Sequence, residues 1–530
     1  MAAFHQVADA VINDDRSADA EMMRQQLCQE KNFHLNFQPQ HGVTHIARFA
    51  YAAFDPQAMV LHDCKTTGIC KNLRYMNDTS DTIAAIATAP GEAGIAIVRI
   101  SGAKSLAVAD RIFSHTGEPP SRRAPGFFLR GMVKSNERIL DEAILLVMRA
   151  PHSYTREDVV EIQCHGGPVS ARRILQAILA AGVRLAEPGE FTKRAFLNGR
   201  IDLVQAEAVL DLIRAQSDRG AKAAVEQLEG NLSSSFNSIY DNMLRVCADL
   251  EAVLDFSEDD APLTLIPGAT AKAQQVLEQI NSMLATWEEG HLLREGALVV
   301  ISGRPNVGKS TLLNALLGKN RAIVSPIPGT TRDTLEETII MEGIPIRLVD
   351  TAGLRTTPCT IEQEGIRRAR SHMQKADLHL YIIDASQPLN SEDSNHLKSL
   401  KSDKSIVIIN KIDLGTIIPE QNMAGLVYIK AQLNVGKGVK EIHDRIIELL
   451  GLTYFRQPNA LIAGRHKQIL QKSYTDIKTV LKILASGSDE SIVPAISHLK
   501  LAIESFGEIT GKIYHTELLN SIFSRFCVGK

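Results

Sequence analysis

The sequence predicts a multidomain protein with an α+β N-terminal domain, a discontinuous α-helical domain, and an inserted α/β nucleotide-binding domain of the P-loop type. Three observations predict this fold class. A complete phosphate-loop pattern lies between a predicted strand and a predicted helix. Helical periodicity flanks that region on both sides. Strand-like apolar runs, punctuated by Pro and Gly, precede the first helical region.

The length allows this number of domains, because 530 residues correspond to roughly three or four domains of about 150 residues each. We expect a new domain to begin at the apolar run Ile83–Ala87, after a polar stretch that follows Met76. The predicted divisions are an N-terminal extension of unknown role (1–77), the α+β domain (78–198), the two helical halves (199–293 and 454–530) and the nucleotide-binding domain (294–453).

Composition excludes several classes of protein. Apolar residues make up 44% and charged residues 22% of the chain, which is typical of a globular protein, and the net charge of −3 gives no overall basic field for nucleic acid. The sequence has no run of 18 apolar residues, so we predict no membrane span. The seven cysteines are scattered and lack metal-ligand spacing. Together with the absence of a secretory signal pattern, they indicate the cytoplasm.

Two apolar runs in the α+β region, Ile95–Ile100 and Ala143–Met148, are typical of strands. The helical halves show apolar residues at steps of three, four and seven. These positions are Ala273, Val276, Leu277, Ile280, Met283, Leu284 and Trp287 in the first half, and Ile469, Leu470, Ile477, Val480, Leu481 and Leu484 in the second. We favour one helical domain made from both halves; two separate helical domains are the alternative.

The phosphate loop runs from Gly303 to Ser310 in the pattern G-x-x-x-x-G-K-[ST]. It follows a predicted strand, 297–301, and precedes a predicted helix, 311–317. This arrangement directs backbone N–H groups at one point, where Lys309 adds a charge for the β- and γ-phosphates. The hydroxyl of Ser310 is the expected Mg²⁺ ligand.

Two further motifs suit a γ-phosphate sensor. Asp350 ends the apolar strand 344–349 and begins the pattern D-x-x-G, so its carboxylate can hold Mg²⁺ through water while the N–H of Gly353 meets the γ-phosphate. Thr331, in the segment 329–333 between the phosphate loop and Asp350, is the expected second Mg²⁺ ligand.

Base recognition is predicted at Asn410-Lys411-Ile412-Asp413, after the strand 406–409. A carboxylate only accepts hydrogen bonds, so Asp413 can take both donors of guanine, a pair that adenine lacks. Alone, this motif is more often an ordinary surface loop; together with the other three motifs it indicates a GTPase. The predicted GTP-binding residues are Asn306, Val307, Gly308, Lys309, Ser310, Thr311, Ser325, Pro326, Ile327, Pro328, Gly329, Thr330, Thr331, Asp350, Thr351, Ala352, Gly353, Asn410, Lys411, Ile412 and Asp413.

One expected side chain is missing. Ras-like enzymes place a Gln after D-x-x-G to orient the attacking water. Here the position is Leu354, which has no polar atom. Another group must therefore orient the water.

From residue 79 to the last residue, the chain resembles the tRNA modification GTPases of the MnmE (TrmE) family. In addition to the four nucleotide motifs, the resemblance rests on Arg99–Gly102, His165–Gly167, Pro188–Thr192, Ala195–Arg200 and Phe526–Lys530. The chain departs from the family at Val528, where Ile is usual, and at Lys430-Ala431-Gln432, where only Ala431 fits the expected Ser-Ala guanine contact.

The resemblance implies a partner and a folate. The family acts as a homodimer, in a heterotetramer with a flavin-dependent tRNA uridine 5-carboxymethylaminomethyl modification protein. Together they install an aminomethyl or carboxymethylaminomethyl group at C5 of the wobble uridine of tRNA. The one-carbon unit comes from 5-formyltetrahydrofolate or a related folate, which the N-terminal domain binds. By position, the folate contacts are Arg99, Glu161, Arg200 and Lys530; taken singly, each residue also suits a surface salt bridge.

The resemblance also implies how water and charge are handled. A potassium ion takes the place of an arginine finger, with the side chain of Asn306 and the carbonyls of Ser325, Ile327 and Thr330 as ligands. Glu362 orients the attacking water through a second water. Cys527 has a catalytic role in tRNA modification, whereas its apolar neighbours alone favour a small core residue.

Two alternatives remain open at the level of sequence. One is a ribosome-assembly or regulatory GTPase, which shares the nucleotide motifs but requires an RNA-binding module that we do not find. The other is a scaffold whose GTP hydrolysis only times the work of a partner enzyme.

Overall fold

The computed structural model describes residues 81–126, 128–255, 265–320, 336–350, 373–423, 425–452, 462–486 and 491–530. The predicted N-terminal extension, residues 1–77, lies outside them. The chain divides into two compact units, 1–79 and 80–530, and the second unit holds all the elements below.

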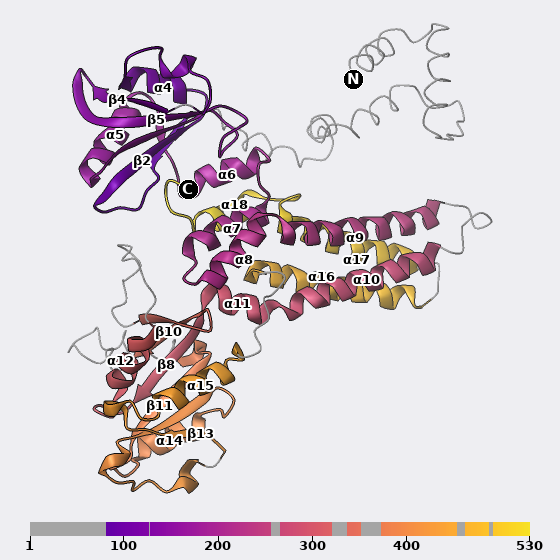
Figure 1. Cartoon of the computed structure of the whole chain (residues 1–530). Coiled ribbons are helices and arrows are strands. Elements are labelled where there is room, and N and C mark those ends of the chain that lie inside the picture. The colour runs from indigo at the N-terminus through magenta and orange to yellow at the C-terminus, as the bar shows by residue number, and fades with distance from the viewer. Residues whose placement is uncertain are drawn as a thin grey trace. The chain divides into compact units, whose positions relative to one another are not determined.

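A seven-stranded sheet forms the N-terminal domain, in the order β3-β4-β5-β6-β2-β1-β7 (Figure 1). Neighbouring strands are antiparallel except β1 and β7, which are parallel. Helices α4 and α5 share one core with the sheet. The elements are β1 (Ile83–Ile86), β2 (Ala93–Ser101), α4 (Ser105–Ile112), β3 (Phe113–Ser114), η4 (Pro120–Arg122), β4 (Phe128–Ser135), β5 (Arg138–Met148), β6 (Val159–Gly166), α5 (Pro168–Ala180), β7 (Arg184–Leu185) and α6 (Glu190–Leu197).

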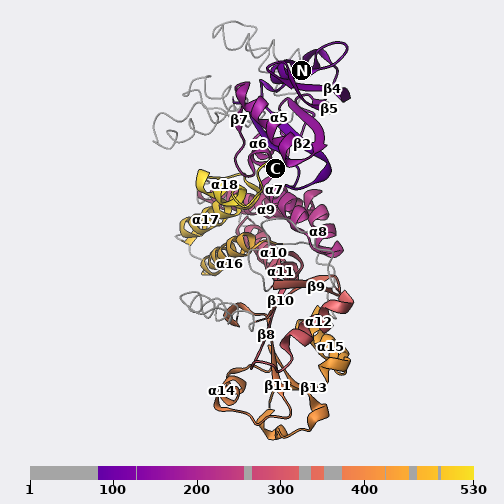
Figure 2. The same ribbon diagram turned by 90° about the vertical axis from the view of Figure 1, so that its left-hand side faces the viewer.

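The helical domain is built from two stretches of the chain. Its elements are α7 (Leu203–Arg214), α8 (Asp218–Leu228), α9 (Asn231–Asp255), α10 (Leu265–Ala285), α11 (Trp287–Glu295), α16 (Gly464–Leu484), α17 (Ile492–Thr510) and α18 (Thr516–Phe523). Residues of α9 and α10 share one apolar core with residues of α16 and α17, and the four helices lie side by side in Figures 1 and 2. The prediction of one helical domain made from two halves is therefore confirmed, and the alternative of two separate domains is wrong.

One detail of the helical prediction was wrong. Trp287 does not continue the helix of Ile280, because α10 ends at Ala285 and Trp287 begins α11. Its ring still packs against the same core. The predicted boundary between residues 293 and 294 falls inside α11, so we propose Gly296, between α11 and β8, as the junction with the next domain.

The inserted domain has a six-stranded sheet in the order β13-β12-β11-β8-β10-β9, parallel except for the edge strand β9. Its elements are β8 (Ala297–Gly303), α12 (Lys309–Asn320), β9 (Glu336–Met341), β10 (Ile344–Asp350), β11 (Leu378–Asp384), α14 (Ser391–Ser399), β12 (Ser405–Asn410), η6 (Ile412–Leu414), η7 (Glu420–Met423), β13 (Val427–Lys430), η8 (Leu433–Val435) and α15 (Val439–Leu449). The strands β8, β10, β11 and β12 all direct their carboxyl ends to one edge, where such sheets bind ligands.

A buried ion network joins both helical halves. His466 Nε2 and Arg465 Nε, at the start of α16, lie 2.7 and 3.0 Å from the carboxylate of Glu207 on α7. The backbone N–H of Ala463 donates to His466 Nδ1 at 3.0 Å, so the ring proton is on Nε2 and donates to Glu207. One helical turn along α7, Asp211 pairs with Arg294 of α11. The network therefore connects the helices that enter and leave the inserted domain.

Within the residues that the structure describes, no helix combines the length and the apolar character that a membrane span requires.

Candidate functional site

The phosphate loop joins β8 to α12, and close contacts with neighbouring atoms require both of its motif glycines. A Cβ on Gly303 would lie 2.3 Å from the carbonyl oxygen of Ile382, and one on Gly308 would lie 2.4 Å from Asn410 Nδ2. Gly308 also has φ +108°, a value that side chains disfavour. Asn306 adopts φ 62° without being glycine. The loop is thus held in a conformation that needs support from its neighbours.

Lys309 lies over this loop and is 5% exposed. Its ammonium donates to the carbonyl oxygens of Gly303 at 2.9 Å and Arg304 at 2.5 Å. The cation is therefore held at the centre of the loop. Next to it, the hydroxyl of Ser310 donates to Asp350 Oδ2 at 3.4 Å. The structure brings together these two predicted Mg²⁺ groups, and oxygen donors are the ligands that Mg²⁺ prefers.

The guanine motif begins with a buried clamp at Asn410. The amide Nδ2 donates to the carbonyl of Val307 at 2.7 Å, and Oδ1 accepts from the N–H of Leu433 at 3.0 Å. Asn410 thus ties the end of β12 to the phosphate loop and to the loop after β13. Ala431, the residue that fits the expected guanine contact, is fully buried beside this clamp.

The rest of the guanine motif faces a different environment. Lys411 Nζ donates to Asp384 Oδ2 at 2.7 Å. Burial raises the pKa of Asp384, but hydrogen bonds from Lys411 and Ser386 outweigh burial, and the net pKa is below its usual value. Asp413, in η6, is exposed. Its carboxylate is accessible to a base, as the predicted guanine contact requires.

Several predicted residues lie outside the described residues. They are Ser325, Pro326, Ile327, Pro328, Gly329, Thr330 and Thr331 in the segment after α12, and Thr351, Ala352, Gly353 and Glu362 in the segment after β10.

A second cluster gathers in the N-terminal domain. Arg99 and Glu161 are register partners on β2 and β6, and their side chains form an ion pair at 2.7 Å with 17% and 12% exposure. The guanidinium of Arg99 lies 5.5 Å from the centroid of the Tyr154 ring, and that of Arg200 lies 4.8 Å from the same centroid. Arg200 Nη1 also donates to the carbonyl of Tyr154 at 3.1 Å. Two of the predicted folate residues, Arg99 and Arg200, therefore meet at one tyrosine, and a third, Glu161, joins them through Arg99.

The C-terminal residues 526–530 complete this cluster. Val528 forms a backbone bridge with Pro188, and the N–H of Phe191 donates to the carbonyl of Lys530 at 3.2 Å. Arg99 Nη1 lies 3.5 Å from the carbonyl of Gly529. Cys527 is a free, exposed cysteine within this segment. The backbone of the segment that holds Cys527 and Lys530 thus lies beside the Arg99 cluster.

Sequence reasoning missed Tyr154 and Phe191 at this site. The Phe191 ring lies 5.6 Å from the guanidinium of Arg99 and is fully buried. A half-buried ion pair between two central strands is a strong constraint, and aromatic faces are the apolar surfaces that stabilise a guanidinium. The sequence offered a weak signal only, because Phe191 lies inside one of the strings that carry the resemblance.

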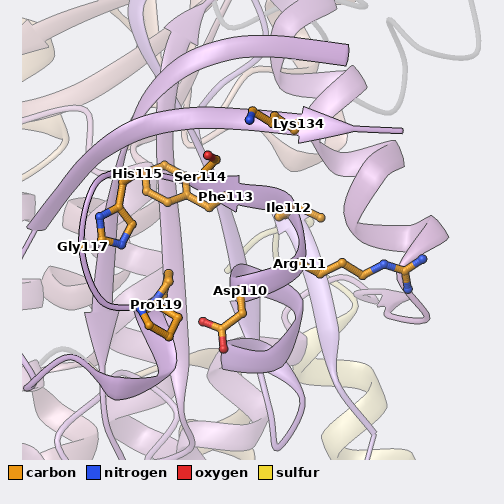
Figure 3. Close-up of a pocket in the computed structure, with 10 residues that line it drawn as sticks. Asp110, Arg111, Ile112, Phe113, Ser114, His115, Gly117, Pro119 and Lys134 are labelled. Carbon is orange, nitrogen blue, oxygen red and sulfur yellow. The ribbon is translucent and has the colours of Figure 1, made fainter. Parts of the chain in front are cut away.

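Figure 3 shows a different pocket of the N-terminal domain, with a volume of about 290 Å³. None of the predicted site residues lines it; the lining residues are Asp110–His115, Gly117, Pro119, Pro120 and Lys134. Among the described residues, no group of three or more His, Cys, Asp or Glu side chains could hold a metal ion.

The parallel sheet, the phosphate loop with its Ser310–Asp350 pair, and the Asn410 clamp define the inserted domain as that of a P-loop GTPase. Two family models match the chain: "GTP-binding protein TrmE N-terminus" over residues 82–200 and "MnmE helical domain" over residues 203–527. The second match runs through the inserted domain, as a discontinuous helical domain requires. The chain belongs to the tRNA modification GTPase MnmE family.

Proteins of similar sequence match this chain over almost the whole of their own length. The tRNA modification GTPase MnmE of Clostridioides difficile is 42% identical over 457 residues, which are 85% of this chain and 99% of that protein. The protein of the same name from Syntrophotalea carbinolica is 43% identical over 459 residues, with the same coverage. A solved structure of Aquifex aeolicus Era bound to GDP.AlF4- is 30% identical and covers 29% of this chain and 56% of that chain, but its TM-score of 0.23 is too low to bear on the fold.

Proposed function

We propose that this chain hydrolyses GTP to GDP and phosphate with Mg²⁺ and K⁺, and that it uses this cycle to modify the wobble uridine of tRNA. The modification is the addition of an aminomethyl or carboxymethylaminomethyl group at C5. A flavin-dependent partner protein takes part, and two copies of this chain join it in a heterotetramer. A folate is the one-carbon donor, and the reaction takes place in the cytoplasm.

The observation that carries the GTPase part is the Asn410 clamp, because one buried amide joins the guanine motif to the phosphate loop. In the GTP complex, Lys309 directs its charge to the β- and γ-phosphates, and Asp413 accepts the two guanine donors. Ser310 and Asp350 would hold Mg²⁺, Asp350 through a water, and the ion would supply charge that stabilises the phosphates during hydrolysis.

The observation that carries the tRNA part is the cluster around Tyr154. Arg200 and Lys530 supply positive charge for the carboxylates of a folate, and Glu161 can accept from pterin N–H groups. The free Cys527 belongs to the C-terminal segment whose backbone contacts Arg99 and Phe191 of this cluster, and in this proposal its thiol acts on a substrate bound there. Its thiol is exposed, which a reactive cysteine requires.

Asn306 would help to hold a potassium ion, which would supply the charge that an arginine finger supplies in other GTPases. Leu354 has no polar atom, and Asn306 lies in the loop that wraps the β–γ bridge. A preorganised cation there is worth about 3–4 kcal/mol by analogy with single oxyanion donors, or roughly a hundred- to thousandfold in rate. Glu362 positions the attacking water through a second water.

The potassium proposal is tested by steady-state GTP hydrolysis in KCl and NaCl at matched ionic strength. We expect a high rate in KCl only, and Asn306→Ala should remove the preference. Asn314→Ala, an exposed asparagine on α12, is the matched control and should keep it. Equal rates in the two salts for the unmutated protein would defeat the mechanism.

The tRNA proposal is tested by mass spectrometry of wobble nucleosides from cells that lack this chain. The modified uridine should disappear and return with the wild-type chain, but not with Cys527→Ser. Val528→Ala, an exposed neighbour, is the control that should restore it. Unchanged wobble nucleosides together with a ribosome-assembly defect would favour the alternative of a ribosome-assembly GTPase.

A further inference from the structure

Arg304, the second residue of the phosphate loop, holds its side chain away from the loop's centre. Its Nε lies 3.1 Å from Asp393 Oδ2, and its Nη2 donates to the carbonyl of Pro388 at 3.3 Å. The guanidinium is therefore bound to α14 and to the segment before it, and it does not supply an arginine finger from within the loop.

Asp393 is an unusual anchor because its side chain is only 1% exposed. Its Oδ1 accepts from the hydroxyl of Tyr381 at 2.8 Å, and its Oδ2 accepts from the N–H of Asn390 at 3.2 Å in a helix-capping box. Arg304 is the cation that compensates this buried carboxylate. A buried, compensated carboxylate with fixed partners has little freedom to move.

Arg304 also contacts the phosphate-binding lysine, Lys309. The backbone carbonyl of Arg304 accepts from Lys309 Nζ at 2.5 Å. One residue thus links the loop's cation to a buried anchor in another element. At the far side of the loop, Asn410 holds the carbonyl of Val307 in the same manner.

We propose that Arg304 and Asp393 form a positioning pair that fixes the entrance of the phosphate loop and thereby sets where Lys309 directs its charge. This inference rests on the proposed GTP hydrolysis. Lys cannot replace Arg304 fully, because a single ammonium does not reproduce the planar fork that meets Asp393 with one nitrogen and Pro388 with another.

The test separates positioning from folding. Arg304→Met alone leaves the buried Asp393 charge unpaired and can destabilise the domain. The double variant Arg304→Met/Asp393→Asn removes both charges, and the Asn oxygen can still accept from Tyr381. We expect its melting temperature to be close to wild type. Misplacement of a reacting group by about 1 Å can cost a hundredfold, so we expect kcat for GTP to fall roughly 10- to 100-fold while KM changes by less than about threefold.

The controls fix the interpretation. Arg445→Met removes an exposed pair with Glu448 on α15 and should leave kcat and KM unchanged. Arg304→Lys keeps the charge against Asp393 and should give an intermediate kcat. A double variant that melts like wild type and hydrolyses GTP like wild type would overturn the inference. A wild-type protein that hydrolyses no GTP would instead overturn the proposed function.

Discussion

The buried carboxylate of Glu207 allows a stability change to be worked out from the structure. Glu207→Gln keeps the size of the side chain and removes its charge. Arg465 and the Nε2–H of His466 then face a neutral amide at a position where the Glu207 side chain is only 14% exposed. Removal of one partner from a buried ion pair costs about 3–5 kcal/mol. We expect Glu207→Gln to lower the free energy of unfolding by about 3 kcal/mol, because the amide oxygen still accepts one hydrogen bond.

The assay uses the single tryptophan of the chain. Trp287 packs against the helical core, and the ammonium of Lys467 lies 4.7 Å from its ring centroid, so its fluorescence reports on the helical domain of the intact protein. With an m-value of about 2 kcal/mol/M, a loss of 3 kcal/mol lowers the urea midpoint by about 1.5 M.

The matched control is Glu251→Gln in the same domain. Glu251 pairs with Lys500 at 2.8 Å, but the two side chains are 47% and 62% exposed, so the midpoint should stay near that of the wild type. Equal shifts for the two variants would refute the reasoning. The double variant Glu207→Gln/Arg465→Gln should lose less free energy of unfolding than its two single variants lose in sum, because it leaves no uncompensated charge.

The same network predicts a dependence on pH. Burial alone would raise the pKa of Glu207, but the charges and hydrogen bonds of Arg465 and His466 together outweigh burial and hold the pKa well below its usual value. The stabilisation is therefore complete above about pH 5 and is lost as the pH falls. Burial lowers the pKa of His466, so its protonation below about pH 6.5 opposes the native state as well. The urea midpoint followed by Trp287 fluorescence should fall from pH 7 to pH 4. The difference in midpoint between the wild type and Glu207→Gln should narrow below about pH 4.5.

Three further predictions concern the two sites. Asp413→Asn should weaken GTP binding and permit xanthosine triphosphate, because an amide donates to the C2 oxygen of xanthine; competition with a fluorescent nucleotide measures this, and equal binding of ATP and GTP by the wild type would contradict the guanine assignment. Gly308→Ala should abolish nucleotide binding, because its Cβ would lie 2.4 Å from Asn410 Nδ2; a variant that binds normally would show that the loop relaxes. Arg99→Ala should weaken binding of 5-formyltetrahydrofolate in calorimetry and leave GTP hydrolysis intact, whereas Arg130→Ala, which loses an exposed ion pair, should bind as the wild type does.

The sequence predicted the strands of the inserted domain well, for a physical reason. A strand buried on both faces is a continuous apolar run, and β8 and β12 are such runs with motifs at their ends. Trp287 shows the limit of periodicity. Its spacing fits the helical face of α10, but a break at Thr286 places it in α11, and the same core accepts it from either helix.

The long-range side-chain pairs could not be predicted from local patterns. Glu207 and His466 are far apart in sequence, and only the packing of α7 against the start of α16 brings them together. Arg304 occupies an unspecified position of the phosphate-loop pattern, so nothing in the sequence indicated its pair with Asp393 on α14. The resemblance assigned Arg99 and Glu161 to the same folate site, but their ion pair was not predicted, because no spacing rule pairs residues on separate strands.

The discontinuous helical domain has a consequence for how the chain reaches its native state. Its core joins residues on α10 and α16 that stand on either side of the whole inserted domain. Bringing such distant segments together from a flexible chain costs entropy that grows with the length between them. The inserted domain is contiguous, and the helical segments on either side of it lie beside each other, since a Cβ on Gly464 would lie 3.6 Å from the ring of Trp287. Once the inserted domain has folded, the segments to be joined are already neighbours. A substitution that delays folding of the GTPase domain should therefore delay assembly of the helical core, although no helical residue has been changed.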